Sequence, residues 1–273
     1  MRGVLKSQST ELLWSNCPYD PKKLTGLERM KLTVVIPTYN EAQNLPDLTA
    51  SLFNLPIENI NLLIVDDDSP DGTGLVADNL VQKYPSQLSV IHRKGKQGLG
   101  SAYLCGFTKA IEINSDLIAQ MDADFSHPPE MLLTLMDALS SSDIALGSRY
   151  IQGGGIDQNW PFWRRNLSGF GNLYSRVILG LPIRDATGGL KMWKREVLAQ
   201  MPLERVRSNG YAFQVEMSYI AYLLGFKFKE IPFYFVDRYL GKSKMSLKIQ
   251  VEAAVRVWQM RYEYRGLKAA SKS

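Results

Sequence analysis

Residues 31–41 read KLTVVIPTYNE, and this stretch decides the fold. Leu32–Ile36 is a short, β-branched apolar run that Pro37 stops at once. Because no polar residue alternates along its whole length, the run is typical of a strand buried on both faces, as in a parallel sheet. The polar residues after Pro37 then stand where the strand ends.

The same arrangement repeats through the first half of the chain. Further short strands are expected at Leu62–Val65, Leu88–His92, Leu117–Met121 and Ile144–Gly147, with helices at Asn44–Leu55, Gly74–Tyr84, Gly100–Ile113 and Pro129–Ser140. Strands that alternate with helices predict a doubly wound, Rossmann-like α/β domain, with a mainly parallel sheet and helices on both faces. A ligand of such a sheet binds beyond the carboxyl ends of the strands.

The pattern changes after Gly147. We expect a loop over Arg149–Arg165, helices at Leu167–Leu179 and Phe213–Leu224, a strand at Lys227–Val236, a basic loop at Arg238–Lys244 and a last helix at Leu247–Tyr264. We interpret residues 1–30 as a loosely ordered extension, residues 31–245 as one domain, and residues 246–273 as an amphipathic helix with a tail.

Composition narrows the possible partners. The 273 residues carry a net charge of +5, which suits an anionic ligand or membrane surface. The cations are spread out, so a nucleic-acid partner is not expected. Two cysteines make no disulfide framework, and we expect Cys105 to be a buried free thiol. With no signal peptide and no stretch of roughly 18 apolar residues, we expect a cytoplasmic protein whose membrane contact is peripheral.

Acidic residues follow two of the expected strands. Asp122, Ala123 and Asp124 come after one strand, where two carboxylates two positions apart can face one site. Hard oxygen ligands suit Mg²⁺ or Mn²⁺ bridged to phosphates, although solvated acids are the alternative for so short a motif. After another strand, Asp67 is a candidate for binding a ribose or base, whereas Asp68 and Asp71 are assigned to capping the Ser-Pro-Asp-Gly turn.

Cations gather in three further places. Arg93–Gly100, with Lys96 inside it, is a plausible phosphate cradle ahead of a helix, or else a mobile surface loop. It matches neither a Walker A loop nor a dinucleotide fingerprint. Arg149 and Arg164 flank an aromatic loop and could grip phosphate oxygens, unless they only cap and pack. Arg238 and Lys244 could close over a pyrophosphate or be solvated surface, and His127 is interpreted as a turn residue.

Four segments together resemble the family 2 glycosyltransferases with the GT-A fold. They are Val35–Glu41, Val65–Thr73, Met121–Pro129 and Gly147–Tyr150. Asn159–Arg165 and Val236–Lys244 add a similarity to the dolichyl-phosphate or polyprenyl-phosphate mannose synthases. The resemblance covers about residues 31–264, which makes residues 31–245 a GT-A catalytic domain.

The resemblance implies roles for individual residues. Pro37, Tyr39, Glu41, Val65 and Asp67 would line the nucleotide pocket. Asp122, Ala123 and Asp124 would hold Mg²⁺ or Mn²⁺ and the donor diphosphate, with Ser126 standing where many relatives have a glutamine ligand. Arg149 and Arg164 would bind the acceptor phosphate, and Arg238 and Lys244 would close over the donor.

The implied reaction is an inverting transfer of mannose from GDP-mannose to a dolichyl or polyprenyl phosphate. An ionised phosphate needs no general base, so the lack of a well-placed histidine is no objection. One alternative is a polyprenyl-phosphate glucosyltransferase that uses UDP-glucose, although Ser126 and the Arg238–Lys244 segment favour GDP-mannose. Another is a non-catalytic nucleotide-sugar or lipid-phosphate binding protein, against which the intact aspartate pair argues.

The last helix carries an apolar stripe among basic residues. The stripe consists of Leu247, Val251, Ala254, Val255, Trp258 and Tyr262. It would either lie on a membrane surface or dock a small membrane subunit, or it would pack on the protein's own core.

Overall fold

The computed structural model describes residues 27–236 and 247–267, and gives only the backbone for residues 247–253. The predicted extension up to residue 26, the predicted loop with Arg238 and Lys244, and the tail after residue 267 lie outside the described residues. None of the helices in the described ranges has the length and apolarity needed to cross a bilayer.

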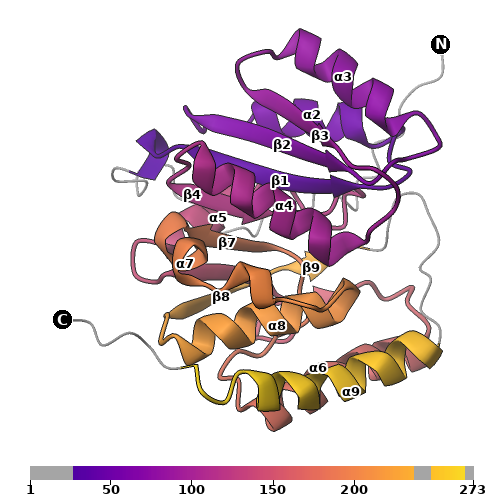
Figure 1. The fold of residues 1–273 in the computed structure, drawn as a ribbon, viewed down its shortest axis with the longest axis vertical. Helices are drawn as coiled ribbons and strands as arrows, with labels where there is room; N and C mark the ends of the chain where they lie inside the picture. Colours follow the sequence, from indigo (N-terminus) through magenta and orange to yellow (C-terminus); the bar gives the residue numbers. More distant parts are fainter. Residues whose placement is uncertain (1–26, 237–246, 268–273) are drawn as a thin grey trace.

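A seven-stranded sheet forms the centre of the described chain (Figure 1), in the order β3-β2-β1-β4-β7-β5-β8. The strands are β1 (Leu32–Thr38), β2 (Ile60–Asp66), β3 (Leu88–His92), β4 (Leu117–Gln120), β5 (Ile144–Ser148), β7 (Lys191–Lys194) and β8 (Phe228–Pro232). All neighbours run parallel except β7, which is antiparallel to both β4 and β5. The predicted mainly parallel sheet is therefore confirmed, with one inserted antiparallel strand.

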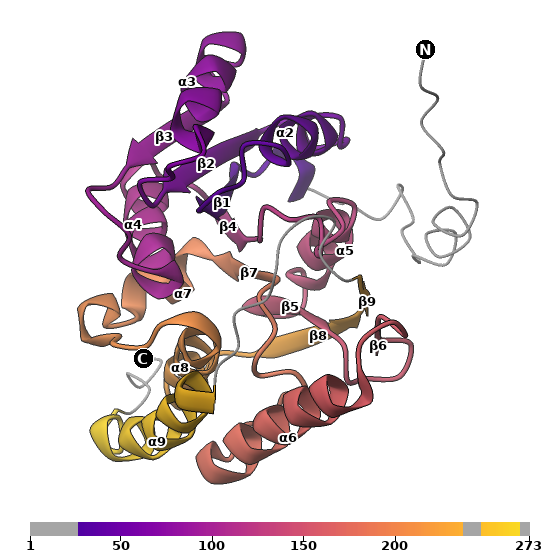
Figure 2. The same ribbon diagram turned by 90° about the vertical axis from the view of Figure 1, so that its right-hand side faces the viewer.

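Helices cover both faces of this sheet (Figure 2). They are α2 (Leu45–Phe53), α3 (Thr73–Lys83), α4 (Leu99–Glu112), α5 (Met131–Ala138), α6 (Phe162–Leu179), α7 (Arg195–Gln200), α8 (Gly210–Leu223) and α9 (Leu247–Glu263). Short 3-10 turns lie at Leu27–Arg29 and Leu203–Arg205, and a small second sheet pairs β6 (Gly155–Ile156) with β9 (Tyr234–Phe235).

The sheet separates two hydrophobic cores. Within β1, Val35 points into a core shared with α4, α7, α8 and α9, while Val34 and Ile36 point into a core shared with α2, α3 and α5. All three side chains have zero exposure. This two-sided burial is the physical reason that the strand sequence lacks a polar face.

Several predicted boundaries were wrong in the second half. Strand β7 and helix α7 had no predicted counterpart, and the single strand expected at Lys227–Val236 is broken into β8 and β9. Helix α6 begins at Phe162, directly after Pro161, instead of at Leu167. Arg164 therefore lies in the first turn of a helix and not in a loop.

Two smaller predictions also change. Cys105 is a free thiol, as expected, but it is only partly buried. In the turn after β2, Asp71 caps as predicted by accepting from the amide and hydroxyl of Thr73, both contacts that lower its pKa against the effect of burial. Asp66, which was not predicted to cap, accepts from the amide and hydroxyl of Ser69, while Asp68 is exposed.

Candidate active site

The carboxyl ends of β1 and β2 meet at one edge of the sheet. Thr38 and Asp66 are register partners at the ends of these strands, and the Thr38 hydroxyl donates to Asp66 Oδ1 over 3.0 Å. Because β4 lies on the other side of β1, the polar segments after β1, β2 and β4 come together at this edge. The structure thus brings together the clusters that the sequence analysis singled out.

Asp67 holds the loop ahead of α4. Its carboxylate accepts from the backbone amides of Gln97 and Gly98 at 2.8–3.0 Å and pairs with Arg93 at 2.7 Å. Both partners in the ion pair are more than nine-tenths buried. Residues 93–98, the part of the predicted phosphate cradle Arg93–Gly100 that precedes α4, are therefore held in place by Asp67. A nucleotide would meet a carboxylate that already has partners.

Lys96, in the same loop, crosses to the segment after β1. Its Nζ lies 3.4 Å from the centre of the Tyr39 ring, within the range of a cation–π contact. Glu41 turns towards α2, where its carboxylate accepts from the Asn44 amide at 2.8 Å. Tyr39 and Lys96 therefore lie together at this edge of the sheet, while the Val65 side chain is fully buried in the core and could present only its backbone to a nucleotide.

Two buried side chains form hydrogen bonds with Asp122, the first aspartate of the pair after β4. The Tyr103 hydroxyl of α4 donates to Asp122 Oδ1 over 3.1 Å, and the amide of Asp122 donates to His127 Nδ1 over 3.1 Å. Tyr103 and His127 are both buried. Burial lowers the pKa of His127, which keeps Nδ1 an acceptor, and raises the pKa of Tyr103, which keeps its hydroxyl a donor.

Asp124, the second aspartate of the pair, and the nearby Ser126 are both buried. Asp124 is 4% exposed and accepts from the amide of Ser126 at 3.1 Å, while Ala123 is buried beside it. The Ser126 hydroxyl is buried and has no hydrogen-bond partner among the described residues. Such an orphaned oxygen, on a residue whose amide binds the Asp124 carboxylate, fits the hard-ligand set of a divalent cation.

The protein's own donors would not complete such a site. No group of three or more His, Cys, Asp and Glu side chains within residues 27–236 and 247–267 could hold a metal ion. Mg²⁺ and Mn²⁺ sites of nucleotide enzymes commonly take one or two carboxylates and complete their shell with phosphate oxygens and water. The residues present therefore fit a cation that arrives with a phosphorylated ligand.

Each of the two arginines predicted to bind the acceptor phosphate lies against one ring of an aromatic pair. The Arg164 guanidinium lies 3.7 Å from the Trp160 ring centre, and that of Arg149 lies 5.5 Å from the Phe235 ring centre. Trp160 and Phe235 pack edge to face, with centroids 5.7 Å apart. An aromatic link thus connects Arg149 at the end of β5 with Arg164 in the first turn of α6.

Arg149 also has a strong partner that the sequence analysis missed. Its Nε and Nη2 bind the two carboxylate oxygens of Asp185 at 2.7 and 2.8 Å, and Nη2 also binds Thr187. Burial opposes the charge on Asp185, but the Arg149 guanidinium lowers the pKa of that carboxyl below its usual value. No motif that we singled out in the sequence covers residues 185–191.

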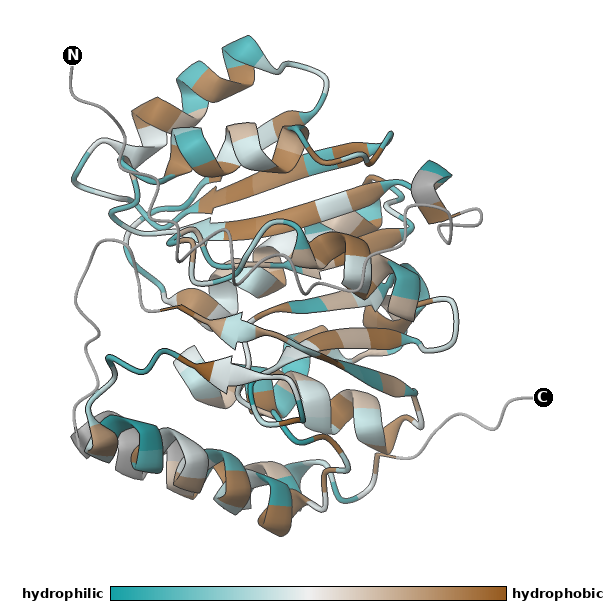
Figure 3. Cartoon of the chain, turned by 180° about the vertical axis from the view of Figure 1, so that it is seen from behind, coloured by the Kyte–Doolittle hydropathy of each residue, from teal (hydrophilic) through white to brown (hydrophobic). Residues whose placement is uncertain are grey.

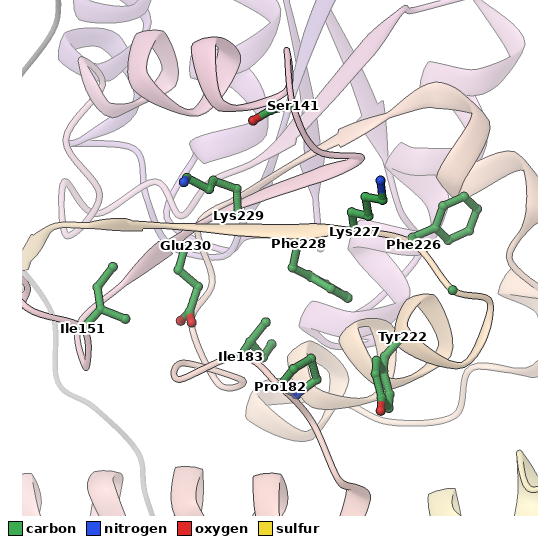
Figure 4. A pocket seen from close by; sticks show the side chains of 11 residues that line it. Ser141, Ile151, Pro182, Ile183, Tyr222, Phe226, Lys227, Phe228, Lys229 and Glu230 are labelled. Carbon is green, nitrogen blue, oxygen red and sulfur yellow. The ribbon is translucent and has the colours of Figure 1, made fainter.

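One open pocket lies elsewhere. It has a volume of about 700 Å³ and is lined by residues of α8, β8 and the segment after α6, with Phe228, Ile183 and Pro182 at its floor in Figure 4. None of the predicted site residues lines it. Glu230, also on its wall, accepts from the amides of Arg184 and Asp185, so this pocket backs onto the segment that holds Arg149.

A sheet of this order with acidic residues at the ends of β2 and β4 defines an α/β glycosyltransferase fold of the GT-A class. The model of the family described as "Glycosyl transferase family 2" matches residues 33–201. The chain belongs to this family and is a glycosyltransferase.

Three curated relatives are similar over most of the chain. The polyprenol monophosphomannose synthase of Mycolicibacterium smegmatis is 44% identical over 83% of this chain and 84% of its own length. The undecaprenyl-phosphate mannosyltransferase of Micrococcus luteus is 42% identical over 88% and 98%. The dolichol-phosphate mannosyltransferase of Pyrococcus furiosus is 38% identical over 85% of this chain and 64% of that protein.

Solved structures agree on the fold. The mannosyl-3-phosphoglycerate synthase of Rubrobacter xylanophilus superposes with a TM-score of 0.64 at 17% identity, covering 91% of this chain and 79% of that one. The glucosyl-3-phosphoglycerate synthase of Mycobacterium tuberculosis, in complex with Mn²⁺, UDP and its product, gives 0.61 at 14% identity, covering 94% and 88%.

Proposed function

We propose that this glycosyltransferase transfers mannose, with inversion, from GDP-mannose to a polyprenyl or dolichyl phosphate in a reaction that needs a divalent cation. The observation that carries the proposal is the shared edge of the sheet. At this edge the aspartate pair follows β4, and Tyr39, with Lys96 over its ring, follows the neighbouring strand β1, while Arg149 follows β5 and is linked through aromatic rings to Arg164. The names of the curated relatives supply the sugar and the lipid class.

The donor end is assigned to the acidic residues after β4. Asp122, Asp124 and the unpartnered Ser126 hydroxyl would hold Mg²⁺ or Mn²⁺. A bound cation would neutralise charge on the diphosphate that leaves the sugar. Lys96, which lies over Tyr39, would add a further positive charge at the donor end. Arg238 and Lys244 keep the role predicted from sequence, in which their loop closes over the donor.

The acceptor end is assigned to the arginines. A phosphate oxygen is already ionised near neutral pH, so the attack on the anomeric carbon needs orientation and charge stabilisation more than proton removal. Arg164 sits in the first turn of α6, where a helix amino terminus also favours an anion. The buried His127 Nδ1 is occupied by the Asp122 amide, which is consistent with a structural role for this histidine.

Helix α6 supports a lipid acceptor because its polarity is inverted. Its buried residues include Asn172 and Ser175, whereas its exposed apolar side chains are Phe162, Trp163, Phe170, Leu173 and Val177, each 54–79% exposed. With 3.6 residues per turn, these five fall within an arc of about 100° on one face. Figure 3, with α6 along the lower edge, shows hydrophobic and hydrophilic residues interspersed along its ribbon.

Helix α9 also exposes apolar side chains. It packs beside α6, with the Tyr174 hydroxyl donating to the carbonyl of Ala254. Among residues 254–267, the buried side chains are Val257 and Met260 of α9 and Tyr264 just after it, while Val255, Trp258 and Tyr262 from the predicted stripe are 52–66% exposed. Of the two alternatives left open for the stripe, packing on the core does not hold for these three exposed residues.

We assign this apolar face of α6 and α9 to peripheral contact with an anionic membrane that carries the acceptor. Flotation with vesicles of phosphatidylcholine and phosphatidylglycerol tests it. Trp163→Ser combined with Leu173→Ser should lower the bound fraction, whereas Leu75→Ser, at a residue 68% exposed on α3, should not. If the double variant bound vesicles as well as Leu75→Ser does, the membrane assignment would be wrong, but the transferase assignment would stand.

A donor screen tests the function. Purified protein is given radiolabelled GDP-mannose or UDP-glucose, undecaprenyl phosphate, and Mg²⁺ or Mn²⁺. We expect lipid-linked mannose that disappears with chelator and in Asp124→Ala. A strict preference for UDP-glucose would overturn the assigned sugar, and nucleotide binding without turnover would identify a binding protein.

A further inference from the structure

Residues 185–191, which we call the strap, lie against both ends of the candidate site. At one end Asp185 and Thr187 hold Arg149, as described above. At the other end Gly189 lies against the donor side, where an added Cβ would come within 3.0 Å of the His127 ring and 3.4 Å of Asp122 Oδ2. The strap therefore touches the arginine assigned to the acceptor and the aspartate assigned to the donor.

The two glycines of the strap have no side chains that could hold it in place. A Cβ at Gly188 would lie 3.2 Å from the carbonyl oxygen of Gly147, which is tighter than an ordinary contact. Glycines allow this close approach, but they also give the backbone extra freedom. A turn of two glycines that must keep a fixed distance to Asp122 needs support from behind.

That support comes from Lys191, the first residue of β7. Lys191 is fully buried, and its Nζ donates to the Gly188 carbonyl at 2.9 Å, to Gln214 Oε1 at 2.9 Å and to the Gln214 carbonyl at 3.2 Å. An ammonium group has three hydrogens, and three acceptors surround it. The Lys191 Nζ thus ties the strap to helix α8.

A second buried side chain ties the neighbouring peptide. Gln120 Nε2, at the end of β4, donates to the Gly189 carbonyl at 2.8 Å and to Gln214 Oε1 at 2.6 Å. Its own Oε1 accepts from the Trp193 indole at 3.1 Å, which fixes the orientation of the amide. Both glycine carbonyls are therefore held from the protein interior, and Gln214 joins the two supports.

We infer that Lys191 is a positioning residue of the transfer site, which holds the Gly188–Gly189 turn against Asp122 and so sets the donor end for its ligand. The inference rests on the proposed use of Asp122 for a metal-bound nucleoside diphosphate. The lysine is costly for stability, because a fully buried ammonium loses its hydration, and burial lowers the Lys191 pKa to about 7. An apolar residue of the same length would avoid that cost, but it would leave the Gly188 and Gln214 carbonyls without this donor.

Three single-residue variants test the inference. Lys191→Met removes the ammonium and keeps the chain length. Gln120→Met removes the donor to Gly189 without touching the lysine. Lys194→Met is the matched control, since Lys194 lies on the same strand, is partly exposed and pairs loosely with Asp143 at 3.9 Å.

The measurements are the affinity for GDP in the presence of Mn²⁺, by calorimetry, and KM against kcat for the donor. Misplacement of Asp122 should weaken Mn²⁺–GDP binding and raise the donor KM by about tenfold or more in Lys191→Met, with kcat changed much less. Gln120→Met should move the same quantities in the same direction, and Lys194→Met should leave both near wild type. Circular dichroism establishes which variants are folded.

Wild-type affinity and KM in a folded Lys191→Met overturn the inference. If that variant does not fold, Gln120→Met decides by the same criterion. UDP replaces GDP if the wild type prefers it, so a wrong donor sugar leaves the inference testable. A wild type that binds neither nucleotide with Mn²⁺ refutes the proposed function and the inference together.

Discussion

Arg149 and Asp185 form a two-pronged ion pair with both side chains almost completely buried, at 5% and 0% exposure. The pair fixes the guanidinium at the end of β5 before any ligand arrives. An arginine held in this way loses little side-chain entropy when it meets a phosphate, although it must share its charge with Asp185.

The buried pair predicts a large stability effect. Asp185→Asn would leave the Arg149 charge buried without its counter-ion, which typically costs about 3–5 kcal/mol. Urea unfolding followed by circular dichroism should show this loss. Glu112→Gln, which breaks an exposed pair with Lys109, should change the unfolding free energy by no more than about 1 kcal/mol. Equal effects of the two substitutions would contradict the prediction.

The hydroxyl of Tyr103 offers a finer test of the aspartate pair. Tyr103→Phe keeps the ring stacked between Phe107 and Phe213 and removes only the hydrogen bond to Asp122. A hydrogen bond to a charged carboxylate is worth about 1.5–3 kcal/mol, so Mn²⁺–nucleotide affinity should fall by about 13- to 160-fold.

Calorimetry on Tyr103→Phe and Tyr84→Phe checks this prediction. Tyr84 lies at the end of α3 and packs on Phe53, so its substitution should not affect binding. An unchanged affinity in Tyr103→Phe would mean that the hydrogen bond to Asp122 does not support ligand binding.

The buried Lys191 predicts a dependence of stability on pH. Its pKa is about 7 in the folded protein, against about 10.4 when unfolded. Between these values the unfolded chain binds more protons, so the unfolding free energy should rise as the pH increases, by at most about 1.4 kcal/mol per pH unit. Asp185 and Arg149, the charged groups that act on Lys191, keep their charges over this range.

Urea unfolding at several pH values from 6.5 to 9 measures this slope. The wild type should gain stability relative to Lys191→Met as the pH rises. Parallel profiles of the two proteins would mean that the lysine keeps its proton in the folded state.

Glu216 predicts how α9 is attached. This fully buried carboxylate of α8 accepts from Arg256 Nη2 at 2.6 Å, from the Tyr264 hydroxyl at 2.9 Å and from the amide of Ser208 at 2.8 Å. Glu216→Gln removes the charge and should destabilise the contact by about 1–3 kcal/mol. Hydrogen exchange in residues 247–263 should become faster, whereas Glu263→Gln, at the exposed end of Arg256, should have a smaller effect. The prediction fails if exchange in α9 does not respond to Glu216→Gln.

The first half of the fold could be predicted because its central strands β1, β2, β4 and β5 are buried on both faces. The runs at Leu32–Ile36 and Leu62–Val65 have no polar face, and this pattern alone indicates a covered parallel sheet. Strand β7 could not be found in the same way. It reads Lys-Met-Trp-Lys, and only the tertiary structure supplies the carbonyls that allow Lys191 to be buried.

The sequence by itself determined the residue types at the ends of β1, β2 and β4, and hence the chemistry of a metal and nucleotide site at one edge. It could not determine which of those side chains bind to each other, because hydrogen bonds between distant segments leave no periodic pattern in the sequence. Asp67 with the 93–98 loop, Tyr103 with Asp122, and the strap that joins Arg149 to Lys191 were decided only by folding. The exposure of the apolar face of α6 was also decided only by folding. The sequence of a helix shows which side is polar, but only packing determines which side is buried.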